Sequence, residues 1–183
     1  MKLNLLIAIL CCPLALMAQD KQSYVRYNKL VEVKGTPYVI ATVVNGGKTG
    51  KSNHFLLFVN TGTNDSREIT MPEGAHLNEV QQVKIDSLNI NKIVLSARTV
   101  NLDGNKSIDW SDPEQIIILS PDGREKTQIT DNNFFVSGWT VNNHTGRMVI
   151  AGHRDTNNNG KLDNSDLNEI LVYDLKQMRM LGK

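Results

Sequence analysis

The chain has 183 residues, of which 40% are hydrophobic and 21% are charged, and its formal net charge is +1. Neither lysine and arginine nor aspartate and glutamate form a long run, which argues against nucleic acid or an anionic membrane as partner. Aromatic residues make up only 5% of the chain. Asn, Thr, Val and Ile are frequent, and this composition favours strands joined by polar turns over helices.

Residues 1–18 are predicted to form a secretory signal peptide. Lys2 is followed by an apolar run over residues 3–17 and by the small residue Ala18, so we expect cleavage before Gln19. The run is too short for a membrane-spanning helix. The expected product is exported, either to the periplasm or out of the cell, and does not insert into a membrane.

Both cysteines of the chain, Cys11 and Cys12, lie inside this predicted signal. Leu10 is too bulky for the cleavage site of a lipoprotein, which favours a soluble product over a lipid anchor. The remaining chain then has no cysteine, so the sequence predicts neither disulfides, nor thiolate metal sites, nor a cysteine nucleophile.

Short β-branched runs alternate with turn-rich segments along residues 19–183, and this spacing predicts a single all-β domain. The expected strands fall into three sets of four, which we interpret as antiparallel blades over about 22–72, 75–130 and 131–183. The predicted strands are 24–33, 38–44, 55–59, 68–70, 80–85, 93–99, 115–119, 126–129, 134–141, 148–152, 169–173 and 177–181.

Residues 155–166 have the ligand spacing of a twelve-residue calcium-binding loop. Side-chain oxygens stand at positions 1, 3, 5, 9 and 12, position 7 offers a backbone carbonyl, and Gly160 at position 6 allows the sharp turn. The alternative is a solvated Asn/Asp-rich hairpin turn without an ion. The predicted Ca²⁺ ligands are Asp155, Asn157, Asn159, Lys161 through its carbonyl, Asp163 and Asp166.

The same pattern recurs 54 residues earlier in a weaker form, and a fixed period of this kind indicates a repeat architecture. Position 1 is the neutral Asn101, and Lys106 stands where glycine is expected, with Gly104 displaced. A register shifted to begin at Asp103 is equally compatible with the sequence. The candidate ligands of this second loop are Asn101, Asp103, Asn105, Ser107, Asp109 and Asp112. The corresponding segment of the first unit, 45–54, has no carboxylate, and we expect no ion there.

Residues 115–130, with the sequence QIIILSPDGREKTQIT, resemble the outer strands of the WD40-like (PD40) repeat of TolB-type β-propellers. Residues 139–150 and, more loosely, 85–95 resemble the inner hairpin of that repeat, although 142–146 read NNHTG in place of the usual SPDG. The resemblance implies three propeller-type blades over most of residues 22–183.

Propellers close rings of about four to eight blades, so three blades correspond to half of a six-bladed ring. Pairing of two chains about a twofold axis would hide the open ends, and we therefore expect a homodimer or association with another propeller fragment.

Three further patterns carry less information. Residues 46–52 resemble a phosphate-binding loop, but Asn45 replaces its first glycine and a strand follows where a helix is required. His54, His76, His144 and His153 are scattered, which predicts surface or turn histidines and no zinc centre. Of the two tryptophans, Trp110 in the second loop is the candidate binding aromatic, and Trp139 is expected in the core.

These observations predict an exported, non-catalytic calcium-binding propeller module that mediates protein or glycan interaction. The sequence contains no Gly-x-Ser-x-Gly nucleophile motif. One alternative is a calcium-dependent lactonase or esterase with the propeller fold. The other is a structural subunit of a cell-envelope complex. We expect calcium affinity in the range of extracellular modules, roughly 10⁻⁴ to 10⁻³ M.

Overall fold

The computed structural model describes residues 25–46 and 52–182. The predicted signal peptide, the start of the first predicted strand and most of the glycine-rich segment 46–52 lie outside the described residues. All twelve predicted strands are present, and each predicted blade range contains one four-stranded sheet. Among the described residues the helical structure is a single short 3₁₀ turn, η1 (Asp86–Leu88).

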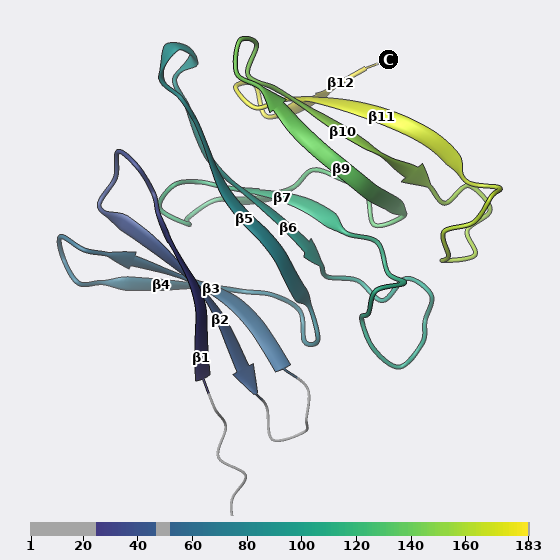
Figure 1. The fold of residues 1–183 in the computed structure, drawn as a ribbon, viewed down its shortest axis with the longest axis horizontal. Coiled ribbons are helices and arrows are strands. Elements are labelled where there is room, and N and C mark those ends of the chain that lie inside the picture. Colours follow the sequence, from purple (N-terminus) through teal and green to yellow (C-terminus); the bar gives the residue numbers. More distant parts are fainter. Residues whose placement is uncertain (1–24, 47–51, 183) are drawn as a thin grey trace, which may run out of the picture.

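The three sheets are antiparallel meanders, each ordered as its strands follow in the chain, and they fan out one after another (Figure 1). This architecture confirms the predicted all-β class with three propeller-type blades. The first sheet contains β1 (Val25–Glu32), β2 (Tyr38–Gly46), β3 (Ser52–Asn60) and β4 (Ser66–Thr70). The second contains β5 (His76–Ile85), β6 (Ile90–Arg98), β7 (Gln115–Leu119) and β8 (Lys126–Gln128). The third contains β9 (Phe134–Asn142), β10 (Arg147–Arg154), β11 (Leu167–Asp174) and β12 (Arg179–Leu181).

Two hydrophobic cores hold the sheets together. One core lies between the first and second sheets and includes Ile40, Leu56 and Phe58 of the first sheet. The other lies on the opposite face of the second sheet, where the third sheet contributes Met148 and Ile150. Because side chains alternate along a strand, the middle sheet must be apolar on both faces. Strand β7 shows this directly, since all five of its residues are buried.

Candidate functional site

The two predicted calcium loops occupy equivalent places in the second and third sheets. Each connects the second strand of its sheet to the third, β6 to β7 and β10 to β11, at the right of Figure 1. Gly160 is buried against the other loop: a Cβ built on it would lie 2.6 Å from the carbonyl oxygen of Leu102. The two loops are therefore in direct contact.

Backbone N–H groups fix the side chains of the third-sheet loop. The carboxylate of Asp155 accepts hydrogen bonds from the N–H groups of Asn159 at 3.2 Å and Gly160 at 2.9 Å. Three further turns each join a side-chain oxygen to the N–H two residues later, from Asn157 to Asn159, from Asn159 to Lys161 and from Asp163 to Ser165. Such Asx turns hold the polar side chains of positions 3, 5 and 9 in defined orientations, and the two bonds to Asp155 do the same for position 1.

Positions 3, 5 and 9 of this loop meet at one carboxylate oxygen. Asp163 Oδ2 accepts hydrogen bonds from the Nδ2 atoms of Asn159 at 2.6 Å and Asn157 at 3.3 Å. Hydrogen bonds from the hydroxyl and N–H of Ser165, followed by that from Asn159, lower the pKa of Asp163 to about 2. The carboxylate, which is ionised at neutral pH in any case, therefore keeps its charge further into the acid range.

Asp166, at position 12, has an oxygen without a partner. Its side chain is only 7% exposed. Oδ2 accepts a hydrogen bond of 2.9 Å from the N–H of Asp163, whereas Oδ1 is buried and has no hydrogen-bond partner. An unpaired buried carboxylate oxygen is costly, and a bound cation would satisfy it.

The second-sheet loop repeats this network 54 residues earlier. The Asx turns at Asn157, Asn159 and Asp163 recur at Asp103, Asn105 and Asp109. The amide of Asn105 donates to Asp109 Oδ2 as Asn159 does to Asp163. Hydrogen bonds from the side chain and N–H of Ser111 also lower the pKa of Asp109. The sequence repeat is therefore a repeat of local structure, with Ser107 donating its N–H at position 7.

The two loops differ at position 12. Both oxygens of Asp112 are used, because Oδ1 accepts from the N–H of Leu102 at 2.7 Å and Oδ2 from the N–H of Asp109 at 2.8 Å. The unpaired buried atom of this loop is instead Asn101 Oδ1, at position 1. An uncharged amide oxygen attracts a cation less strongly than a carboxylate does. Of the two loops, only the third-sheet loop thus has a carboxylate as its unpaired buried oxygen.

Neither loop gathers many acidic ligands. Within residues 25–46 and 52–182, no three His, Cys, Asp or Glu side chains form a group that would hold a metal. The predicted ligand set of the third-sheet loop depends on two amides and the carbonyl of Lys161 in addition to carboxylates, which is the oxygen-rich mixture that calcium accepts.

An aromatic and basic cluster beside the second-sheet loop was missed by the sequence reasoning. The rings of His54 and His76 are 5.6 Å apart, and His76 stacks with Trp110 at 6.3 Å. The guanidinium of Arg98 lies 4.8 Å from the centre of the Trp110 ring. Trp110 is nonetheless 76% exposed, so part of the indole faces solvent.

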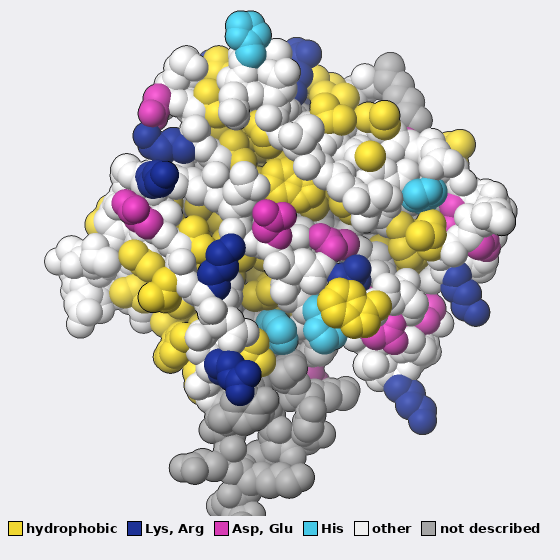
Figure 2. Space-filling model, viewed as in Figure 1, with side chains coloured by type: hydrophobic (Ala, Val, Ile, Leu, Met, Phe, Trp, Pro, Cys, Tyr) yellow, Lys and Arg dark blue, Asp and Glu magenta, His cyan; other side chains and the backbone are white. Residues whose placement is uncertain are grey.

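Hydrogen bonds hold His76 and Arg98, the two residues that contact Trp110. His76 Nε2 lies 3.1 Å from the carbonyl oxygen of Ile108, and Arg98 Nε donates to the carbonyl oxygen of Asp112 at 3.1 Å. Histidine atoms (cyan) lie beside exposed hydrophobic and charged atoms just below the centre of the view in Figure 2. His54 and His76 are separated in the sequence, and the packing of the first sheet against the second brings them together. A tryptophan held in place but open to solvent is suited to binding.

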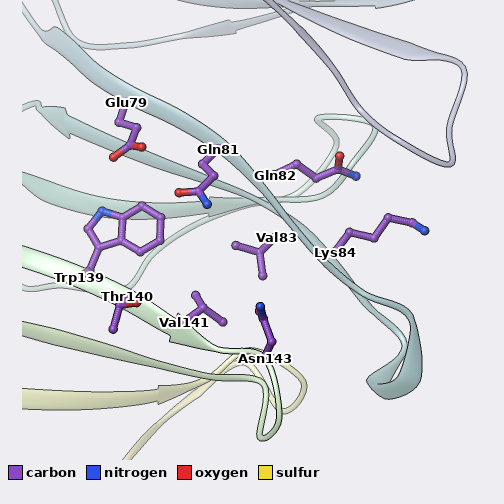
Figure 3. A pocket seen from close by; sticks show the side chains of 9 residues that line it. All are labelled: Glu79, Gln81, Gln82, Val83, Lys84, Trp139, Thr140, Val141 and Asn143. Atoms are coloured by element: carbon purple, nitrogen blue, oxygen red, sulfur yellow. The ribbon is translucent and has the colours of Figure 1, made fainter.

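A separate polar hollow of about 380 Å³ lies between β5 and β9. Glu79 and Gln81 reach from β5 toward Trp139 on β9 (Figure 3). Trp139 also packs against the core between the second and third sheets, as the sequence predicted. The lining is mostly polar, in contrast to the apolar pockets that enclose most small ligands.

Comparison with known proteins finds similar structures at low sequence identity. No protein-family model and no curated protein matches the chain. Among solved structures, it is similar to the β-propeller domain of the Trilobed protease from Pyrococcus furiosus, with 13% identity and a TM-score of 0.46, over 86% of this chain and 42% of that one. It is similar to an acylaminoacyl peptidase of Pyrococcus horikoshii at 12% identity and TM-score 0.46, over 89% of this chain and 25% of that one. For the apocarotenoid oxygenase of Synechocystis, identity is 16%, the TM-score is 0.39, and 80% and 35% of the two chains are covered. The chain thus spans less than half the length of each of these proteins.

The sheet order and packing of this chain define a propeller-type all-β protein with three blades. None of the helical structure in residues 25–46 and 52–182 is long and apolar enough to cross a membrane.

Proposed function

We propose that this chain is an exported, non-catalytic binding module in which the third-sheet loop binds calcium and the neighbouring loop presents Trp110 to a protein or glycan ligand. The observation that carries the calcium assignment is the buried, unpaired Oδ1 of Asp166. Asp155, Asn157, Asn159, Asp163 and Asp166 would hold the ion with their side chains, and Lys161 with its carbonyl oxygen.

The contact between the loops gives calcium a structural role. An ion bound to the third-sheet loop stabilises the backbone around Gly160, which lies against Leu102 of the second-sheet loop. That second loop includes Trp110. Calcium binding to the native state alone stabilises it by mass action, by about 2.7 kcal/mol at a concentration one hundred times the dissociation constant. The ion therefore orders the binding surface and takes no part in a reaction.

A calorimetric calcium titration of the chain beside Asp166→Asn and the matched variant Asp112→Asn tests the site. We expect saturable binding with a dissociation constant of roughly 10⁻⁴ to 10⁻³ M, lost in Asp166→Asn and retained in Asp112→Asn. Binding that survives Asp166→Asn would overturn the assignment of this loop. Absence of binding at about 10 mM calcium would overturn the calcium proposal itself.

The ligand is tested separately with a panel of immobilised glycans and peptides, using Trp110→Ala and Trp139→Phe as the pair of variants. Binding lost with Trp110→Ala and kept with Trp139→Phe supports the exposed indole as the contact. Chelator should weaken binding of the unmodified chain. Hydrolysis of a lactone or ester panel that disappears with chelator would replace the proposal with the calcium-dependent enzyme.

A further inference from the structure

The outer face of the first sheet is apolar. Because Ile40, Leu56 and Phe58 point into the core, the alternate residues of the same strands point away from it. Cross-strand pairing places Tyr27 beside Val43 and Phe55, and Leu30 beside Ala41 and Leu57, on this outer face. Tyr27 and Leu30 on the edge strand are 62% and 71% exposed, whereas Val43 and Ala41 beside them on β2 are buried. Two large apolar side chains thus stand open on the first sheet.

The outer face of the third sheet has the same character. Met148 and Ile150 point into the core, so Val149 and Ala151 face outward. Val149 pairs with Val172, and Ala151 with Ile170 and Gly138. Ile170 is 63% exposed, and no atom lies within 4 Å of a Cβ built on Gly138. This face also has an open apolar surface.

The two outer faces carry charges of opposite sign. On the first sheet, Glu32 is paired with Val39 and Glu68 with Leu57, so both carboxylates face outward. On the third, Arg147 and Arg179 flank Asp174. Asp174 is itself buried, and its Oδ1 accepts hydrogen bonds from the N–H groups of two following residues, 176 and 177. The first face therefore presents acidic groups and the third presents basic ones.

We propose that the outer face of the first sheet packs against the outer face of the third sheet of a second copy of this chain. The opposite charges make the outer face of the first sheet complementary to that of the third, and both faces have apolar centres. Two first-sheet faces would not be complementary, because their carboxylates would face each other. A twofold axis makes both contacts at once and closes a ring of six sheets, which leaves neither face open.

The contact area is sufficient for a stable pair. Strands spaced about 4.8 Å apart with a rise of about 3.3 Å per residue give a four-stranded face roughly 400 Å² in extent. Two such contacts bury roughly 800 Å² per chain, the size of a standard protein interface. Pairing through these faces does not require calcium, so the proposed dimer can be tested independently of the proposed calcium site.

The experiment is a light-scattering mass measurement on the purified chain and on Leu30→Glu, Ile170→Glu and Leu162→Glu. Leu162 is the matched control, because it is 54% exposed in the calcium loop and lies on neither outer face. We expect two chains per particle for the unmodified protein and for Leu162→Glu. Leu30→Glu and Ile170→Glu should each reduce the mass to one chain, with unchanged strand content by circular dichroism.

Charge reversal tests the pairing of unlike faces. Glu68→Arg and Arg147→Glu should each weaken the pair, and combining them should restore part of the lost association. A one-chain mass for the folded unmodified protein would overturn the proposal. So would an open series of larger species, a stoichiometric complex with a different protein, or equal dissociation of the Leu162→Glu control.

Discussion

Gly160 lies against the carbonyl oxygen of Leu102, and this contact joins the two candidate calcium loops. A Cβ at position 160 would stand 2.6 Å from that oxygen and 3.0 Å from the Cα of Asp103, closer than ordinary packing permits. The backbone of Gly160 also has φ of +72°, which glycine adopts without steric cost. The glycine at position 6 thus allows the turn of its own loop and also leaves room for the second-sheet loop to pack against it.

Gly160→Ala is therefore expected to destabilise the protein more than the same change in the other loop. Gly104→Ala is the control, because φ is +68° there but no atom lies within 4 Å of the added Cβ. The left-handed conformation costs each variant about 1–2 kcal/mol, and Gly160→Ala additionally forces the loops apart. Thermal unfolding of the two variants measures the difference. Equal melting temperatures would show that the loops separate freely.

Much of the fold was predictable because the strands are short, β-branched and separated by turn residues. The run 116–119 illustrates this, as four large apolar residues in succession predict a strand buried on both faces. The calcium-like loops were predictable because their Asx turns are local: each side chain bonds to the backbone two residues later. Spacing in the sequence then translates directly into geometry.

The histidine and tryptophan cluster was not predictable in this way. His54 and His76 come from different sheets, and Trp110 comes from a loop. Their meeting depends on how the first two sheets pack, for which residue spacing carries no information. The contact of Gly160 with Leu102 is nonlocal for the same reason, although glycine at position 6 was the signal that located the turn.

Leu119→Ala is expected to cost about 2–5 kcal/mol of unfolding free energy, because it leaves a cavity in a fully buried position. Leu162→Ala, at a residue that is 54% exposed, should change stability by less than about 0.5 kcal/mol. Chemical denaturation of the two variants compares them. Similar costs would contradict the assignment of β7 to the centre of two cores.

Arg154 links the end of β10 to two carboxylates next to the candidate calcium loop. Its Nη1 lies 2.9 Å from Asp131 Oδ2, and its Nε lies 2.9 Å from Glu169 Oε2. The side chain of Glu169 is only 9% exposed, so Arg154→Ala removes a charged partner from a largely buried carboxylate. We expect a loss of about 1–3 kcal/mol, the cost of removing the partner of a buried acceptor. Calcium binding should also weaken, because Asp155 directly follows Arg154.

The matched variant is Arg124→Ala, which breaks the pair with Asp122 at 3.2 Å. Arg124 is 69% exposed, and surface pairs contribute about 0–1 kcal/mol. Calorimetry and thermal unfolding of both variants separate a general loss of charge from a specific effect on the loop. A calcium affinity unchanged by Arg154→Ala would show that the loop is ordered without this anchor.

Mild acid is expected to weaken the Trp110 cluster through His54. Burial, followed by the proximity of His76, lowers the pKa of His54 from its ordinary value. The unfolded chain therefore binds a proton more readily than the native state. The stabilisation from neutral His54 is fully present above about pH 6.5, the unfolded value, and is lost as the pH falls through the lower folded value. The melting temperature should consequently decrease as the pH is lowered below about 6.5, and this decrease should be smaller in His54→Gln. His144→Gln, at an exposed turn position, should keep the full dependence. If His54→Gln lost as much stability in acid as the unmodified chain, the pH dependence would come from other groups.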